Sequence, residues 1–313
     1  MKSKSVLKRQ IFKIQQLRCK SNSKTEQLVL NGFWRSGTTF IQEFLQSVYH
    51  TEFIFEPLNE VVDETRLLMD SLNFPKGKNN RRIYMPELDL NDNTISKIWF
   101  NKIIHLELSD SWTKLMYNYK KIHTYNPSKN IIKFVNAHFF LTEIVKKGIP
   151  VIHINRDLIS TINSFKRTKW SVFFQDLNFD NHLPSVFYEL YGQKFKEIMN
   201  EVSLQNNYLF KVALFKLVTD YWVKENVKDL YFIDYDDFIK KPFKYLQDIS
   251  TLTGWELKEV NFQKNLKKPS STAQNYSKIN DGIIKKSSLV LSESEIIFLK
   301  QLEISFNKLT WKK

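Results

Sequence analysis

A short loop near the start of the chain combines glycine, arginine and hydroxyl residues, which are the residue types that hold an anion. An apolar run ends at Gly32, and from Thr38 onwards apolar residues recur at helical spacing. Glycine lets the backbone fold tightly, and the first turn of a helix leaves N–H groups unpaired beside the positive end of its dipole. Such N–H groups form a cradle for phosphate. We therefore predict a strand, a phosphate loop and a helix, against the simpler alternative of a glycine turn between core elements.

The loop lacks the residue that a nucleoside triphosphatase needs. Gly32 and Gly37 have the spacing of a P-loop, but Thr38 stands where that motif carries lysine, so the group that would reach a γ-phosphate is missing. Arg35 provides one fixed cation, which suits a terminal phosphate with a charged group beside it. A kinase or an ATPase is therefore disfavoured. The loop residues predicted to bind the nucleotide are Arg35, Ser36, Gly37, Thr38, Thr39 and Phe40.

The segment Arg35-Ser36-Gly37-Thr38-Thr39 resembles the 5′-phosphosulfate loop of the sulfotransferases. The likeness is greatest to the carbohydrate and tyrosylprotein branches, which have arginine where the cytosolic branch has lysine. Members of the family take a sulfuryl group from 3′-phosphoadenosine 5′-phosphosulfate (PAPS) and release the 3′,5′-bisphosphate (PAP). The resemblance implies an α/β fold of three layers, similar to that of the P-loop nucleoside triphosphatases, with a central parallel sheet and helices on both faces.

A second signature follows a buried strand in the middle of the chain. Arg156 closes the apolar run that begins at Pro150, and Ser164 stands eight positions later on the following helix. This pair resembles the 3′-phosphate site of sulfotransferases, where arginine forms a forked clamp and serine adds a hydroxyl. Leu158 replaces the proline that is common after the Arg-Asp pair in the family. Two such sites together specify a nucleotide with phosphates at both ends of its ribose, and ATP does not require the second site.

A basic loop late in the chain is a further candidate for the nucleotide site. Ser270 and Ser271 follow Lys267-Lys268-Pro269 in a stretch rich in hydroxyl groups. Family members often return a late loop over the 3′ side of the nucleotide, so the resemblance implies a binding role for these two serines. A surface linker is the simpler alternative, because serine and threonine are common in loops.

Two residues compete for the role of catalytic base. Glu56 follows an alternating strand and precedes Pro57, which puts it at the sheet edge where open α/β sheets bind ligands. In carbohydrate sulfotransferases an acidic residue in this region is placed to take the proton of the acceptor. Cytosolic members use histidine, and His138 follows Lys133 by more residues than their usual Lys-x-His. As alternatives, Glu56 is a surface or capping carboxylate and His138 is a packed histidine.

The resemblance also implies how these residues share the chemistry. An acceptor hydroxyl attacks sulfur while Glu56 removes its proton, and Arg35, Lys133 and the loop N–H groups stabilise the charge that grows on the sulfuryl oxygens and the leaving phosphate. We expect no metal, because the six histidines are scattered without metal-ligand spacing.

The remaining pattern predicts a single sulfotransferase domain over residues 1–313. Residues 1–24 form a basic N-terminal segment, and residues 59–129 have the least regular pattern and are interpreted as an insertion that shapes the acceptor site. Its basic run is either a solvated loop or a positive rim for a polyanionic acceptor. We expect parallel strands near Leu28, Ile132, Val151 and Tyr231, and helices over residues 242–252 and 292–309.

The composition favours anionic partners without choosing among them. Lys+Arg 47 against Asp+Glu 33 gives a net charge of +14, which attracts a nucleotide, an acidic glycan, nucleic acid or anionic lipid. No helix-turn-helix, zinc-finger or RNP-like motif supports nucleic acid. A single cysteine, Cys19, fits a reducing compartment, and no stretch has the length of a membrane span or of a signal peptide. We therefore expect a cytoplasmic protein, with peripheral membrane contact through residues 1–24 as a minor alternative.

The predicted activity is the transfer of a sulfuryl group from PAPS to an acceptor hydroxyl. The arginine of the first loop and the segment Phe55-Glu56-Pro57 favour a hydroxyl on a glycan or glycolipid, with a small metabolite or a tyrosine as alternatives. A P-loop small-molecule kinase and a basic nucleic-acid-binding protein are the competing classes. The sequence leaves the oligomeric state open.

Overall fold

The computed structural model describes residues 26–59, 62–73, 85–90, 95–105, 126–168, 174, 179, 183, 185–258 and 289–310. The N-terminal segment 1–24, the basic run 76–82 and the late loop with Ser270 and Ser271 lie outside these residues. The predictions made for those three segments therefore stay predictions.

A five-stranded parallel sheet organises the chain, with the strand order β2-β3-β1-β4-β5. Its middle strand β1 contains Leu28, Val29 and Leu30, all completely buried, as expected for a parallel sheet covered on both faces. β1 pairs with β3 in the register Val29↔Ile132 and with β4 in the register Asn31↔His153. The strands are β1 (Glu26–Gly32), β2 (Thr51–Phe55), β3 (Asn126–Lys133), β4 (Val151–Asn155) and β5 (Tyr231–Asp234).

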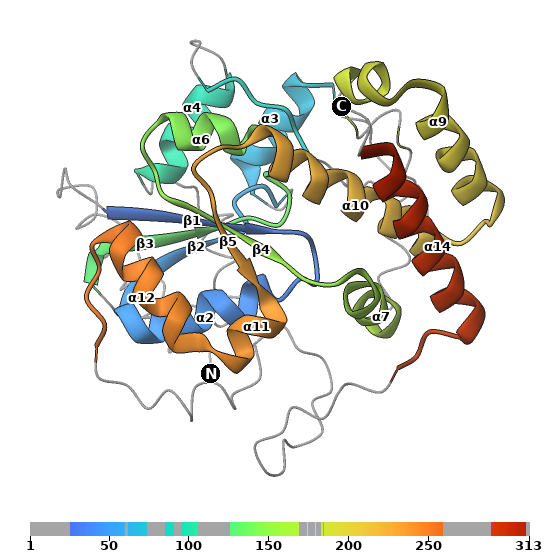
Figure 1. Cartoon of the computed structure of the whole chain (residues 1–313). Coiled ribbons are helices and arrows are strands. Elements are labelled where there is room, and N and C mark those ends of the chain that lie inside the picture. Colours follow the sequence, from blue (N-terminus) through green and yellow to red (C-terminus); the bar gives the residue numbers. More distant parts are fainter. Residues whose placement is uncertain are drawn as a thin grey trace, which may run out of the picture.

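Helices cover both faces of the sheet, which confirms the predicted α/β architecture (Figure 1). One face carries α2 (Thr38–Tyr49), α11 (Tyr235–Lys240) and α12 (Pro242–Thr253). The other carries α3 (Asp63–Ser71), α4 (Ile95–Ile104), α6 (Leu141–Lys146) and α10 (Tyr208–Asn226). Beside α10 lie α7 (Leu158–Thr168), α9 (Ser185–Leu204) and α14 (Glu293–Thr310), and the 3₁₀ turn η1 (His138–Phe140) precedes α6.

The region predicted as an insertion contributes to the main core. Leu68 of α3 and Trp99 of α4 are buried in the same apolar cluster as the strands. Trp99 also donates a hydrogen bond of 3.1 Å from Nε1 to Oγ1 of Thr65 on α3, which joins the two helices. β3 begins at Asn126, so the strand takes up the last residues of the stretch assigned to the insertion. The sequence did not show this because Asn126-Pro127-Ser128-Lys129 has no apolar alternation.

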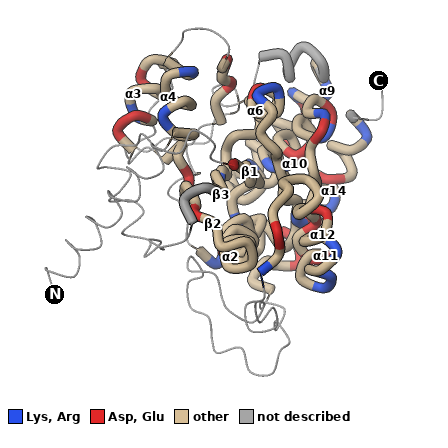
Figure 2. The backbone as a smooth tube through the Cα atoms, turned by 90° about the vertical axis from the view of Figure 1, so that its left-hand side faces the viewer, with Lys and Arg blue, Asp and Glu red and all other residues tan. Residues whose placement is uncertain are grey.

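Charges of both signs are mixed along the outer helices. Figure 2 shows basic and acidic residues on the same helices, for example on α3, α6 and α11. Arg66 pairs with Asp63 on α3 at 2.6 Å and Lys146 with Glu143 on α6 at 2.7 Å. Among the described helices, none combines the length and the apolar character needed to cross a bilayer.

Candidate functional site

The loop between β1 and α2 is held tightly at both of its glycines. Gly32 ends β1, and a side chain there would meet Ile154 O, Ser36 Oγ and Thr38 Cγ2 at 2.8 Å each. Gly37 has a φ of 93°, a left-handed conformation that glycine adopts without strain, and it directly precedes the first turn of α2. No side chain caps that turn, so its N–H groups face the loop. The predicted phosphate loop therefore has the backbone of an anion cradle.

Tyr235 closes one side of this loop. A β-carbon on Gly37 would lie 2.2 Å from Cδ2 and Cε2 of the Tyr235 ring, so the ring packs directly on the glycine. The guanidinium carbon of Arg156 lies 4.6 Å from the centroid of the same ring, on its face. The contact of Tyr235 with Gly37 depends on the order of the strands in the sheet and was not predicted from the sequence.

The two predicted phosphate stretches converge at the start of α2. Arg156 directly follows β4 and donates from Nη1 to the backbone oxygen of Arg35 at 3.2 Å. Arg35, whose φ is 67°, donates from Nε to Oγ of Ser164 on α7 at 3.1 Å. The residues predicted for the 5′ and 3′ phosphates thus touch one another across more than a hundred positions of sequence. This juxtaposition is what a single site for a doubly phosphorylated nucleotide requires.

Glu56 and Lys133 form an ion pair on the other side of the loop. The Nζ atom of Lys133 lies 2.5 Å from Oε1 of Glu56 and donates to Oγ1 of Thr39 on α2 at 2.9 Å. The Lys133 side chain is 1% exposed, whereas that of Glu56 is 21% exposed and so meets solvent at the sheet edge. Burial lowers the pKa of Lys133, and the neighbouring Glu56 carboxylate offsets part of this effect. A cation that bonds directly to Thr39 and a carboxylate paired with that cation therefore lie beside the phosphate loop.

The sequence itself matches the family model described as "Sulfotransferase domain" over residues 25–293. The chain belongs to the sulfotransferase domain family. The family and the enzyme class predicted from the two phosphate signatures are therefore confirmed. A comparison with curated proteins finds no match.

Two solved structures align with most of the chain at low sequence identity. Mouse sulfotransferase SULT7A1 complexed with PAP aligns over 96% of this chain and 89% of its own, with 13% identity and a TM-score of 0.43. Retinol dehydratase in complex with androsterone and inactive cofactor PAP aligns over 93% of this chain and 82% of its own, with 14% identity and a TM-score of 0.40.

Several polar atoms of this sulfotransferase site fit a phosphorylated ligand. Ser36 is buried in the loop, and its hydroxyl oxygen has no hydrogen-bond partner among the described residues. Within the same part of the chain, the buried Nε atom of Arg156 also has no partner, although Nη1 of that side chain is bonded. Buried polar groups are normally satisfied, so these two atoms mark positions where an acceptor oxygen belongs. The uncapped first turn of α2 adds donors beside them.

His138, the second candidate for the base, is fully buried. The residue is 0% exposed in η1, between the rings of Phe33 and His153, at centroid distances of 6.3 and 5.3 Å. Burial, followed by the neighbouring His153, lowers the pKa of His138 well below its usual value of 6.5. A base must meet the hydroxyl that it deprotonates, so this burial favours Glu56 over His138 as the base, and a catalytic role of His138 stays a prediction.

A buried polar cluster that the sequence did not predict lies next to His138. His138, His153 and Asp220 each place a potential metal-ligand atom within 4.8 Å of the others. The three residues come from η1, β4 and α10, so no short spacing in the sequence could reveal them. Lys216, one turn before Asp220 on α10, is 3% exposed and donates to the second carboxylate oxygen of Asp220.

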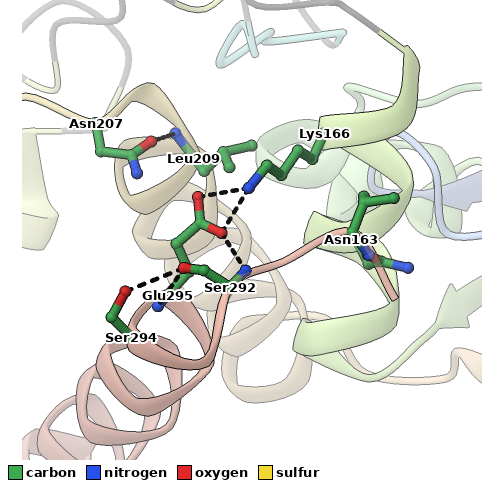
Figure 3. A network of polar contacts seen from close by, with 8 residues as sticks. Asn163, Lys166, Asn207, Leu209, Ser292, Ser294 and Glu295 are labelled. Atoms are coloured by element: carbon green, nitrogen blue, oxygen red, sulfur yellow. Dashed lines mark hydrogen bonds and ion pairs between the residues drawn. The ribbon is translucent and has the colours of Figure 1, made fainter. Parts of the chain in front are cut away.

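Helix α7, which carries Ser164, is fixed from outside by the start of α14 (Figure 3). Lys166 of α7 donates to both carboxylate oxygens of Glu295, at 2.9 and 2.7 Å. On the same helix, Asn163 accepts a bond of 2.8 Å from the backbone N–H of Val290. The backbone N–H and the hydroxyl of Ser292 bond to Glu295 in turn, which caps α14. Contacts on both sides of Ser164 therefore hold its helix in place.

Proposed function

We propose that this sulfotransferase moves the sulfuryl group of PAPS to a hydroxyl of its acceptor, with Glu56 as the base. One observation carries the proposal: Arg156 reaches the backbone of Arg35, and Arg35 reaches Ser164, at 3.2 and 3.1 Å. An arginine beside the N–H cradle suits the 5′-phosphosulfate. A second arginine and a serine hydroxyl at the same place suit the 3′-phosphate of that nucleotide.

The chain's own residues divide the work around the donor. PAPS, when bound, supplies the sulfuryl group in an activated phosphosulfate. The first turn of α2, Ser36 and Arg35 hold the 5′ end, while Arg156 and Ser164 hold the 3′-phosphate. Lys133 adds a buried cation that stabilises developing negative charge, and its bond to Thr39 fixes it next to the loop.

Glu56 has the position that the proton transfer needs. Its side chain is partly exposed, and its carboxylate is 2.5 Å from Lys133, so an acceptor hydroxyl can approach from solvent and meet the base beside the phosphate loop. The backbone N–H of Glu56 donates to the oxygen of Lys133 at 2.9 Å, which holds the residue at a φ of 45°. Such left-handed conformations cost energy in residues other than glycine and cluster at functional sites.

A sugar hydroxyl on a glycan or glycolipid is the acceptor that we favour. The support is the pattern of the site: arginine in the phosphate loop and glutamate directly after the second strand, as in the carbohydrate branch of the family. The mixed charges on the described outer helices give little support to nucleic acid as the partner.

The donor is tested by calorimetric titration of the purified protein with PAP, AMP and ATP. The second phosphate site predicts that PAP binds at least tenfold more tightly than AMP, since a charge-assisted hydrogen bond contributes about 1.5–3 kcal/mol. Equal and weak binding of all three nucleotides would refute the proposed function.

The base is tested by Glu56→Gln in a transfer assay with labelled PAPS and a panel of glycan acceptors. Loss of a general base lowers kcat by about 10²–10⁴-fold, while the PAP dissociation constant should stay within about threefold because Glu56 faces the acceptor. The matched control is Glu52→Gln, the same substitution at the opposite end of β2, which should retain its rate. A normal kcat in Glu56→Gln would remove Glu56 from the mechanism.

A further inference from the structure

The buried cluster on α10 connects the helix to the strand that delivers Arg156. Lys216 and Asp220 are one helical turn apart, and His153 and Asn155 are two positions apart on β4, so each pair lies on one side of its element. Lys216 donates to Asn155 Oδ1 at 3.4 Å, and Asp220 Oδ1 lies 3.6 Å from Nε2 of His153. Lys216 and Asp220 also bond to each other. We call these four residues the α10–β4 latch.

Hydrogen bonds on the far side of His153 determine which of its ring nitrogens carries the proton. The backbone N–H of Ala137 donates to Asn31 Oδ1 at 3.3 Å, which turns the amide nitrogen of Asn31 towards His153. That nitrogen donates to His153 Nδ1 at 3.1 Å, so Nδ1 is an acceptor. In the neutral ring the proton therefore resides on Nε2 and points at Asp220.

This tautomer argues against a metal ion in the cluster. A metal bound by His153 would need the lone pair of Nε2, and a ligating histidine normally donates its other N–H to an acceptor. Here Nδ1 faces an amide N–H donor instead. In addition, the ammonium group of Lys216 already occupies the second oxygen of Asp220 and would repel a cation. The proton on Nε2 of His153 and the charge of Lys216 therefore both favour contacts between protein groups over a bound metal ion.

A buried charged pair is a poor source of stability. Removing an ammonium and a carboxylate from water costs several kcal/mol per ion, and apolar residues of similar volume often replace such pairs without loss. The flanking residues of α10 are apolar and fully buried, among them Leu214, Phe215 and Val218, so an apolar pair would fit the same surroundings. Burial alone would raise the pKa of Asp220, but Lys216 and the neighbouring His153 lower it, so the carboxylate stays charged. What the pair does contribute is the orientation of the strand end, because Lys216 bonds to Asn155, the last residue of β4.

We propose that Lys216 and Asp220 are positioning residues that fix the end of β4 and thereby aim Arg156 at the 3′-phosphate. The inference rests on the proposed function. Asn155 is the exposed last residue of β4 and immediately precedes Arg156, so losing the bond from Lys216 would loosen the strand end and, with it, the contacts of the Arg156 guanidinium with the backbone oxygen of Arg35 and the ring of Tyr235. AMP has no 3′-phosphate, so its binding does not depend on where Arg156 lies. The latch therefore sets the preference for PAP over AMP rather than nucleotide affinity in general.

Two variants test the latch by calorimetry with PAP and AMP. Asn155→Ala removes the acceptor of Lys216 at the rim of the sheet without changing the core. The double variant Lys216→Met/Asp220→Leu replaces the charged pair with apolar side chains. We expect each to weaken PAP about tenfold and to leave AMP within about twofold. The combination of all three changes should weaken PAP no further, because both variants cut the same connection.

The outcomes separate the latch from the proposed function. If the wild-type protein does not prefer PAP to AMP, the proposed function fails, and the latch fails with it. If the wild type prefers PAP and both variants keep that preference, the latch alone is overturned. It is also overturned if the losses of the two variants multiply in the combination, because Asn155 would then act independently. Because Asn155→Ala leaves α10 unchanged, a folding defect in the double variant still leaves a decisive result. One zinc ion per chain, lost in His138→Gln, would overturn the latch in favour of a metal centre.

Discussion

The substitution Gly37→Ala is the sharpest test of how the phosphate loop is built. The φ of 93° at Gly37 is a conformation that side chains rarely adopt, and the new methyl group would lie 2.2 Å from two carbons of the Tyr235 ring. The ring would have to retreat by roughly 1 Å to reach ordinary van der Waals contact. Tyr235 is also the surface on which Arg156 lies, so the displacement reaches the arginine predicted to bind the 3′-phosphate.

The magnitude follows from two separate costs. A left-handed backbone costs about 1–2 kcal/mol in an L-residue, and overpacking a tight contact typically adds about 1–3 kcal/mol. We therefore expect a loss of about 2–5 kcal/mol in the free energy of unfolding. Nucleotide binding suffers because the cation–π contact, about 0.5–1 kcal/mol, and one charge-assisted hydrogen bond, about 1.5–3 kcal/mol, are disturbed together. Binding of PAP should weaken by about 2 kcal/mol or more, which is roughly 30-fold.

Urea denaturation and PAP calorimetry measure the two effects, and Gly254→Ala is the matched control. Gly254 follows α12 with a φ of 70°, and no described atom lies within 4 Å of the added methyl group. The variant Gly254→Ala therefore has the backbone strain without the clash. It should lose about 1 kcal/mol of stability and bind PAP normally. Equal behaviour of the two variants would refute the close packing of Tyr235 on the loop. In the double variant Gly37→Ala/Tyr235→Ala, the part of the stability loss that is due to the clash should return.

Two further predictions concern stability. Because burial and the neighbouring His153 lower its pKa, folded His138 stays neutral while the unfolded chain takes up a proton below about pH 6.5. The free energy of unfolding should therefore fall, by on the order of 1 kcal/mol, as the pH drops below that value. His138→Phe should remove that part of the pH dependence in urea denaturation, and an unchanged slope would contradict the burial. Lys166→Met should cost about 0.5–1 kcal/mol and speed amide hydrogen exchange at the start of α14, because Glu295 loses both of its bonds from Lys166; unchanged exchange would show that other contacts hold this end.

The parts of the site that follow strands could be predicted from the sequence. A short apolar run indicates a buried strand of a parallel sheet. Three site residues end such a run or directly follow one: Gly32, Glu56 and Arg156. Since the carboxyl ends of parallel strands share one edge of the sheet, proximity in space follows from the type of the elements alone. The position of Arg156 at the same sheet edge as the phosphate loop was therefore predictable, whereas its contact with Arg35 also requires β4 to lie next to β1.

Two features of the site could not be predicted from the sequence: how deeply a side chain is buried, and which helices and strands lie next to each other. His138 stands in a short segment whose pattern does not distinguish a buried turn from an exposed one, so its accessibility required the fold. The latch joins α10 to β4, and its register is set by how the helix crosses the sheet. A charged pair spaced by one turn within an apolar helix, Lys216 and Asp220, is the one signal that could have indicated a buried ion pair.

The strand order also explains why the two halves of the chemistry stay apart. β1 carries the phosphate loop in the middle of the sheet; β3 and β2 lie on one side of it and β4 and β5 on the other. The first pair delivers Lys133 and Glu56, and the second delivers Arg156 and Tyr235, each at or directly after the last residue of its strand. Adjacent strands are about 4.8 Å apart. The ladder of backbone hydrogen bonds therefore sets how far each strand end lies from the loop, and side-chain contacts aim the group that the strand end carries. In the proposed function, the acceptor's proton leaves on one side of the loop while the ribose phosphate is held on the other. A change on the β4 side should therefore alter nucleotide affinity and leave the proton transfer at Glu56 intact.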